Sequence, residues 1–229
     1  AFFDVLKSDK RRHDWLLGRW TGKRLVQAVI GNGLPLEGVE ILAAEDGAPI
    51  ANIQYPISNH QSPISNLQSL TLSLSHSHDH AFCGLVEQAN FPLGVDIERI
   101  EERTEGFVRD YFVGEEIALV ETLPRENRAG VVTAIWSAKE AALKAIRVGL
   151  LADTFAVKCL PQGDGLTNVN YANWSPVSIA WDQSKLKRPA PALSGWWRVW
   201  KEFVLTLAVA QDVQIFSIHE EHEDHEGKL

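Results

Sequence analysis

The sequence predicts an α+β protein of two similar halves related by a pseudo-twofold axis, each a small antiparallel sheet with packed helices. Three observations predict this class. A helical pattern occupies residues 9–30, alternating runs between residues 70 and 100 indicate strands, and a stretch rich in Ala, Leu, Lys and Glu at 130–146 indicates a second long helix. An order of helix, strands, helices and strands is typical of α+β proteins.

The elements divide the chain into two predicted halves and a tail. We expect an N-terminal half at residues 1–90 and a C-terminal half at 91–211, which carries the candidate metal-binding acids. The last residues, 212–229, are charged and rich in His, so we expect this tail to be disordered.

The N-terminal half begins with a helix and continues as strands. Apolar and basic residues alternate between two helical faces over residues 9–30. "GNGLPLEGVEI" ends this helix and leads into a strand, and Asp46-Gly47 marks a turn before the next strand. "PISN" occurs at 56–59 and again at 63–66, which is too little for a repeat architecture, so we interpret residues 56–69 as an inserted surface loop. Strands are predicted at 70–77 and 81–88.

The C-terminal half is predicted to begin with a strand, continue with helices and end with strands. "PLGVDIERI" (92–100) predicts the first strand, and residues 105–122 look helical, with an aromatic face of Phe107, Tyr111 and Phe112. The helix at 130–146 follows, with Gly149 as its stop signal. Short strands are predicted in "FAVKCL", "VSIAW", "WWRVW" and "FVLTLAVA".

Composition and charge limit the classes of function. Hydrophobic residues make up 45% of the 229 residues and the formal net charge is −8, so the chain lacks the basic excess of a nucleic-acid binder. Residues 7–24 are strongly cationic, so an anionic ligand is expected to meet a local patch. No apolar run approaches the ~20 residues that span a bilayer, and none reads as a signal peptide. Cys83 and Cys159 form neither a disulfide framework nor a CxxC pair, which predicts a cytoplasmic protein.

Two acids interrupt an apolar run in "FPLGVDIERI". Because a strand turns alternate side chains to opposite faces, Asp96 and Glu98 point the same way while Val95 and Ile97 point the other way. Two adjacent like charges repel and raise a carboxylate pKa unless a positive charge lies between them. The pair alone fits a surface edge strand as well as a metal site.

The helix "WSAKEAALK" supplies a third acid and a lysine. Glu140 and Lys144 are four residues apart and share a helical face. Such a pair is usually solvated, and we place Trp136 and Leu143 on the opposite face. A third carboxylate brought to Asp96 and Glu98 would instead complete an oxygen cage for Mg²⁺, and Lys144 would suit a phosphate held by that ion.

A histidine cluster follows the strand at 70–77. His76 lies at the strand end between Ser75 and Ser77, where hydroxyls and an imidazole are natural donors to a phosphate. The alternative is a strand-end histidine bonded to a neighbouring carbonyl. His76, His78 and His80 also alternate as zinc ligands would, but no Cys or helical HxxxH accompanies them, so zinc is the weaker interpretation.

These motifs together resemble a known family. "LGVDIE" followed some forty residues later by "WSAKEAALK", with "SLSHS" upstream, is similar to the 4′-phosphopantetheinyl transferases of the Sfp type. "RRHDWLLGR", "DGAP" and "YFVGEE" support the resemblance, which spans roughly residues 9 to 210. It implies Mg²⁺-dependent transfer of phosphopantetheine from coenzyme A to a serine of an apo acyl or peptidyl carrier protein. Mn²⁺ is an alternative ion.

The resemblance also implies residue roles. Asp96, Glu98 and Glu140 would bind the metal, Lys144 would neutralise the phosphoryl group, and Glu140 would act as the base for the serine. Ser75 and His76 would contact the 3′-phosphate of coenzyme A. The remaining implied contacts are with the nucleotide phosphates, from Lys10, Arg11 and Arg12, and with the adenine end, from Gly47 and Pro49.

The implied partner is a carrier protein, and we choose Phe107, Arg109 and Phe112 as its docking residues on a monomeric enzyme. The chain departs from the family pattern where Ala48 replaces the lysine of a G-K-P turn. Two other interpretations stay open: a Mg²⁺-dependent nucleotide phosphohydrolase, and a non-catalytic coenzyme A-binding module.

Overall fold

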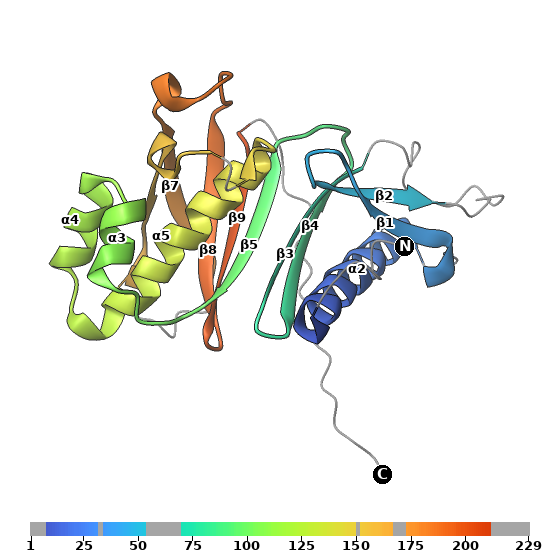
Figure 1. Cartoon of the computed structure of the whole chain (residues 1–229), viewed down its shortest axis with the longest axis horizontal. Coiled ribbons are helices and arrows are strands. Elements are labelled where there is room, and N and C mark those ends of the chain that lie inside the picture. Colours follow the sequence, from blue (N-terminus) through green and yellow to red (C-terminus); the bar gives the residue numbers. More distant parts are fainter. Residues whose placement is uncertain (1–7, 32–33, 54–69, 150–151, 167–172, 212–229) are drawn as a thin grey trace, which may run out of the picture.

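The structure of the chain is a computed structural model that describes residues 8–31, 34–53, 70–149, 152–166 and 173–211. The predicted loop at 56–69 and the predicted tail at 212–229 lie outside the described residues. Within those residues the chain forms four α-helices and nine strands in three antiparallel sheets (Figure 1). The α+β prediction is therefore confirmed. No helix in the described part is both long and apolar enough to cross a membrane.

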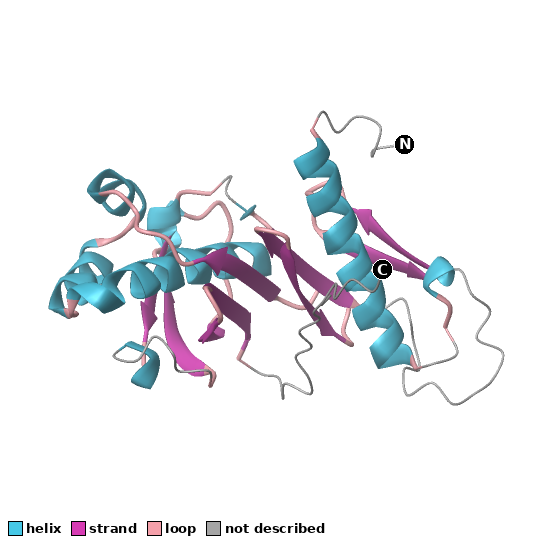
Figure 2. Ribbon diagram, turned by 90° about the horizontal axis from the view of Figure 1, so that it is seen from below, coloured by secondary structure: helices cyan, strands magenta, loops and turns pink. Residues whose placement is uncertain are grey.

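The N-terminal half consists of one long helix and two antiparallel hairpins. Helix α2 has the predicted bounds, and its first turn is capped by the Ser8 hydroxyl, which accepts a hydrogen bond from the Arg11 N–H. Helix α2 lies against the strands of this half (Figure 2). Leu25, Val26 and Ile30 are buried in the core between the helix and the strands. The elements are α2 (Asp9–Ile30), β1 (Val39–Ala43), β2 (Pro49–Ile53), β3 (Thr71–Ser77) and β4 (His80–Val86).

The C-terminal half is a five-stranded sheet with the order β5-β9-β8-β7-β6. A long helix, α5, lies across one face of this sheet (Figure 1). Several alanines of α5 are buried in the core between the helix and the sheet. The elements are β5 (Leu93–Arg99), α3 (Glu105–Tyr111), α4 (Gly114–Thr122), α5 (Arg125–Ala145), β6 (Val157–Pro161), β7 (Ser175–Trp181), β8 (Leu193–Trp200) and β9 (Phe203–Ala210).

The helical pattern predicted over residues 105–122 is confirmed, but it forms two helices, α3 and α4, with a break between them. Phe112 has an extended backbone (φ −112°, ψ 142°) and its ring is 1% exposed in the core beside α5. The Glu116 carboxylate accepts a hydrogen bond from the Val113 N–H at 2.8 Å, which begins a new helix there. Helix α5 also begins five residues earlier than predicted, at Arg125.

Glycine at position 94 lets α5 lie directly against β5. A Cβ atom at Gly94 would collide with the backbone of Ala141 and Ala145, so only glycine permits this approach. On the other face of β5, Val95 and Ile97 pack with Phe82 of β4, which joins the two halves. Asp96 and Glu98 therefore face α5, and the close approach brings them to Glu140.

Candidate active site

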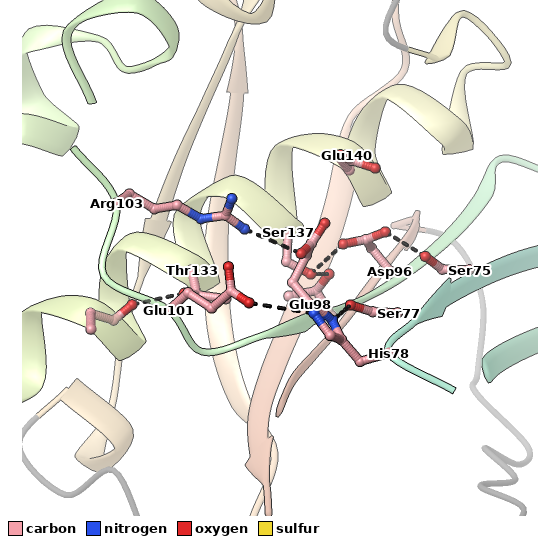
Figure 3. A network of polar contacts seen from close by, with 12 residues as sticks. Ser75, Ser77, His78, Asp96, Glu98, Glu101, Arg103, Thr133, Ser137 and Glu140 are labelled. Carbon is pink, nitrogen blue, oxygen red and sulfur yellow. Dashed lines mark hydrogen bonds and ion pairs between the residues drawn. The ribbon is translucent and has the colours of Figure 1, made fainter. Parts of the chain in front are cut away.

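Three carboxylates converge between β5 and α5. Oxygens of Asp96, Glu98 and Glu140 all lie within 4.8 Å of one another, and we call these three residues the acid cluster (Figure 3). Asp96 and Glu98 share a face of β5 as predicted, and Glu140 comes from the adjoining turn of α5. The predicted convergence of a strand pair and a distant helix is therefore found.

Asp96 is the most buried member of the cluster, with 1% of its surface exposed. Its Oδ1 accepts hydrogen bonds from the Ser75 hydroxyl at 2.7 Å and from Lys144 Nζ at 2.6 Å. Its Oδ2 accepts from the Ser137 hydroxyl at 2.7 Å, and that hydroxyl also lies 2.9 Å from Thr206 Oγ1. These contacts fix the position and orientation of the Asp96 carboxylate (Figure 3).

Glu98 and Glu140 are more accessible, with 22% and 15% of their side-chain surface exposed. Burial and then the charge of Asp96 raise the pKa of Glu98 to about 7, against the opposing effects of Arg103 and a hydrogen bond from Trp136. Burial and then Asp96 also raise the pKa of Glu140 to about 7, although Lys144 opposes the shift. Burial is therefore the main reason that both carboxylates hold a proton more tightly than usual, and the charge of Asp96 adds to it.

Lys144 is the cation nearest to the cluster. Its Nζ contacts Asp96 Oδ1, the Ser75 hydroxyl at 3.1 Å and Glu140 Oε2 at 3.7 Å. Burial lowers the pKa of Lys144, but the charges of Asp96 and Glu140 outweigh burial, so the pKa lies above its ordinary value. Lys144 is therefore a fixed positive charge beside the acids.

The acid cluster fits a hard divalent cation. Mg²⁺ and Mn²⁺ prefer oxygen ligands, and all three donors are carboxylates. Burial and then the charge of Asp96 raise the pKa values of Glu98 and Glu140, and a cation between the carboxylates would offset both effects. The donor set and its spacing therefore meet the requirements of such an ion.

A hollow of about 330 Å³ lies beside α2, and we call it the α2 hollow. Arg11 and Arg19 from α2 line it together with His76 from β3, and the Arg19 guanidinium lies 3.7 Å from the centre of the Trp15 ring. Gly47 and Pro49 line it from the β1–β2 turn. The α2 hollow thus combines cations with apolar surface.

A second hollow of about 420 Å³, the α5 hollow, lies between the halves at the end of α5. Lys144 and Arg147 line it from the C-terminal half, and Ser73 lines it from β3. Gly47 and Pro49 of the β1–β2 turn line both hollows. This turn therefore borders both hollows.

The structure brings together some of the predicted ligand-binding residues and separates others. Arg11, Gly47, Pro49 and His76 line the α2 hollow. Lys10 is bonded instead to Asp14 at 2.8 Å, and Arg12 contacts Asp9 at 3.4 Å. Partial burial lowers the pKa of His76.

Ser75 is separated from its neighbour His76 because alternate residues of β3 face opposite sides. His76 faces the α2 hollow, whereas Ser75 is 8% exposed and binds Asp96 and Lys144. The two side chains therefore do not face the same place, and this geometry does not let both contact one phosphate. Ser75 belongs to the support of the acid cluster.

The zinc interpretation of the histidines finds no support in the described part of the chain. The groups there with metal-ligand spacing are the acid cluster and a second set at His13, Asp14 and Asp79. His76, His78 and His80 do not form such a group. The ammonium of Lys10 already binds Asp14 of the second set.

Several residues of the site were missed by the sequence interpretation. Trp136 was placed opposite Glu140, which is wrong, since its side chain donates to Glu98. The spacing of four between Trp136, Glu140 and Lys144 was the available signal, because residues four apart share a helical face. Ser137, Arg103 and Thr206 carried no comparable signal: the spacing of Ser137 and of Arg103 from the acids matches no motif, and Thr206 comes from the distant strand β9.

The choice of Phe112 as a docking residue is wrong, because Phe112 is 1% exposed and packs in the core. Phe107 is half-buried and packs edge-on against Trp136 at 5.1 Å between ring centres, and Arg109 is exposed. Phe107, Tyr111 and Trp136 line a hollow of about 460 Å³, the aromatic hollow. Trp136 connects it to Glu98 of the acid cluster.

Comparison with known proteins identifies the family. No curated protein matches the chain. The model of one family matches residues 92–208, which contain β5, α5, the whole acid cluster and Lys144. The match covers just over half of the 229 residues and supports phosphopantetheine transfer as the general activity. The chain belongs to the 4′-phosphopantetheinyl transferase superfamily.

Proposed function

We propose that this protein is a 4′-phosphopantetheinyl transferase of the Sfp type. It transfers the phosphopantetheine group of coenzyme A to a serine of an apo acyl or peptidyl carrier protein and depends on Mg²⁺, with Mn²⁺ as an alternative. The observation that carries the proposal is the acid cluster, in which three carboxylate oxygens lie within 4.8 Å beside Lys144. Simple binding of coenzyme A does not require a third carboxylate at this place.

The N-terminal half favours the Sfp type. The family match begins at residue 92, whereas α2 and β1 to β4 add a second helix-and-strand unit before it. This unit supplies the cations and the turn of the α2 hollow. We therefore propose that residues 1–90 and 91–211 act as two halves of one monomeric, cytoplasmic enzyme, each half contributing one side of the cofactor site.

The two hollows offer a consistent path for coenzyme A. The nucleotide end, with its phosphates, suits the α2 hollow, where Arg11, Arg19 and His76 provide positive or protonatable groups. The pyrophosphate then lies at the acid cluster and Lys144. The pantetheine arm suits the α5 hollow, whose volume is about 420 Å³ and whose walls include Leu72 and Leu93.

The reaction exchanges one P–O bond for another. The serine oxygen of the carrier bonds to the phosphorus that bears pantetheine, and the bond from that phosphorus to the bridging oxygen breaks. The bridging oxygen leaves with adenosine 3′,5′-bisphosphate, and the serine proton passes to a base. Such transfers depend mainly on positioning and on neutralisation of charge, so a nucleophile of the enzyme itself is not needed.

The chain's residues supply these requirements. Asp96, Glu98 and Glu140 would hold the divalent ion, which supplies charge neutralisation on the pyrophosphate when bound. Lys144, held by Asp96 at 2.6 Å, adds a fixed positive charge at the transferred group. Glu140 is the base that takes the proton of the carrier's serine. It is the cluster member on α5, and the hydroxyls of Ser75 and Ser137, which hold Asp96, do not fix it.

The aromatic hollow is the proposed dock for the carrier. It adjoins Glu98 through Trp136, so a protein seated there would bring its serine to the acid cluster. Phe107 contributes apolar surface, and the exposed Arg109 suits the acidic surface usual in carrier proteins.

Intact-mass measurement tests the proposal. Several apo carrier proteins are incubated with the enzyme, coenzyme A and Mg²⁺, and one carrier is expected to gain the mass of one phosphopantetheine. Glu140→Gln should abolish the gain, whereas Glu115→Gln on the surface of α4 should preserve it. A lack of gain on every carrier, with coenzyme A cleaved in their absence, would favour the phosphohydrolase. Binding of coenzyme A without either reaction would favour the binding module.

A further inference from the structure

An ion pair connects the β1–β2 turn with the end of α5. Arg147 donates from Nε to Asp46 Oδ2 at 2.7 Å and from Nη2 to Asp46 Oδ1 at 2.9 Å. The two residues are 101 positions apart and belong to different halves. A bidentate contact of this kind fixes direction as well as distance. The turn of one half is therefore attached to the helix end of the other.

Asp46 also shapes its own turn. Its Oδ1 accepts a hydrogen bond from the Ala48 N–H at 3.2 Å, and Gly47 has a φ of +83° that glycine adopts without steric cost. The turn is closed by a hydrogen bond from the Gly47 N–H to the Ala44 carbonyl at 2.9 Å. Because Gly47 and Pro49 line both hollows, the position of Asp46 sets the wall that the hollows share.

The backbone at Arg147 gives independent evidence that the side chain is needed. Arg147 has a φ of +59° directly after the last turn of α5, where its N–H bonds to the Lys144 carbonyl at 2.9 Å. Glycine is the usual residue at such a helix end, since other residues pay a steric penalty there. An arginine in this position keeps a strained backbone and gains the contact with Asp46.

The surroundings of the pair agree with a role in ligand binding. Burial is partial, with 39% of the Arg147 and 38% of the Asp46 side-chain surface exposed, so the pair contributes modestly to overall stability. Contact with Arg147 lowers the pKa of Asp46, and contact with Asp46 raises that of Arg147, so both are charged at neutral pH. Lys144 of the acid-cluster site lies one helical turn before Arg147 and lines the same α5 hollow.

We propose that Asp46 and Arg147 form a clasp that positions the β1–β2 turn against both hollows and thereby sets the affinity for coenzyme A. The proposal rests on the proposed function, since coenzyme A is its ligand. Asp46 and Arg147 are positioning residues: they act on the ligand through Gly47 and Pro49, and they take no part in the transfer of the phosphoryl group.

Binding of coenzyme A and of adenosine 3′,5′-bisphosphate, measured by titration calorimetry, tests the clasp. Asp46→Asn should weaken both about fivefold, the factor that corresponds to about 1 kcal/mol. In steady-state assays the KM for coenzyme A should rise by a similar factor while kcat at saturation stays the same. Glu115→Gln, which breaks an exposed pair with Lys158 (2.9 Å) between α4 and β6, should have no effect.

The sign of the Asp46 effect decides between two roles of Arg147. If Arg147 bound a phosphate directly and Asp46 merely neutralised it, Asp46→Asn would free the guanidinium and strengthen binding. Unchanged or stronger binding by Asp46→Asn would therefore overturn the clasp. Arg147→Gly controls for folding: it relieves the strained backbone, so its midpoint of thermal unfolding should be no lower than that of the wild type while its affinity falls. If the wild-type protein bound neither compound, the proposed function itself would fail.

Discussion

Replacement of Glu140 by glutamine should stabilise the metal-free protein at alkaline pH while it destroys the metal site. Burial and the charge of Asp96 raise the pKa of Glu140 from its ordinary 4.5 to about 7. Each pKa unit corresponds to about 1.4 kcal/mol, so an ionised Glu140 costs the folded protein about 3 kcal/mol at pH 8 relative to the unfolded chain. Glutamine resembles the protonated acid and avoids this cost.

The sign of the pH dependence follows from the raised pKa. Between about pH 4.5 and pH 7 the folded protein holds a proton on Glu140 that the unfolded chain releases, so the stability of the wild type falls as the pH rises through this window. The advantage of Glu140→Gln should therefore be near zero at pH 4.5 and close to its full value at pH 8. For a chain of this size, about 3 kcal/mol corresponds to roughly 6–12 °C in the unfolding midpoint.

Thermal unfolding followed by circular dichroism in EDTA measures the difference between the two proteins. Addition of Mg²⁺ at pH 8 should raise the midpoint of the wild type and leave that of Glu140→Gln unchanged. A variant less stable than the wild type at pH 8, or an equal gain at pH 4.5 and pH 8, would refute the view that burial and the charge of Asp96 make an ionised Glu140 costly in the folded protein.

Three further predictions concern neighbouring groups. Mg²⁺ must displace the proton of Glu98, whose pKa is about 7, so the apparent Mg²⁺ affinity should decrease as the pH falls below 7. The decrease should reach up to about tenfold per pH unit for each proton displaced. An affinity that calorimetry finds independent of pH would contradict this. His76→Ala should raise the KM for coenzyme A several-fold without lowering kcat, because His76 lines the α2 hollow away from the acids; an unchanged KM would remove it from the binding site. Lys139→Met should cost about 3–5 kcal/mol in urea unfolding, since it leaves the Glu116 carboxylate, 2.9 Å from Lys139 Nζ and fully buried, without its cation. The double variant with Glu116→Gln should recover part of that loss, because glutamine carries no charge and its oxygen can still accept a hydrogen bond from the Val113 or Cys159 N–H; no recovery would contradict this.

The two parts of the acid cluster were predictable because the signal of each part is local. The alternation of β5 places Asp96 beside Glu98, and the spacing of four in α5 places Glu140 beside Lys144. The bounds of α2 were predicted correctly for the same reason, since its pattern lies within one continuous segment. That the two segments meet depends on Gly94, where helix and strand backbones approach.

The remaining features depend on contacts between distant residues. The break between α3 and α4 follows from the burial of Phe112 and from the bonds of Glu116 to the Val113 and Cys159 N–H groups, which span 3 and 43 residues. The hydroxyl of Ser137 reaches Asp96 across 41 residues, and Arg147 reaches Asp46 across 101. No periodicity in a single segment encodes such pairs, so the sequence alone did not reveal them.

The most direct test of the proposed metal site is the anomalous diffraction of a crystal grown with Mn²⁺ and coenzyme A. We expect one strong peak bonded to carboxylate oxygens of Asp96, Glu98 and Glu140, with a pyrophosphate oxygen completing its ligands and Lys144 beside the phosphate. A peak elsewhere, or a Glu140 carboxylate turned away from an ion held by the other two acids, would contradict the account.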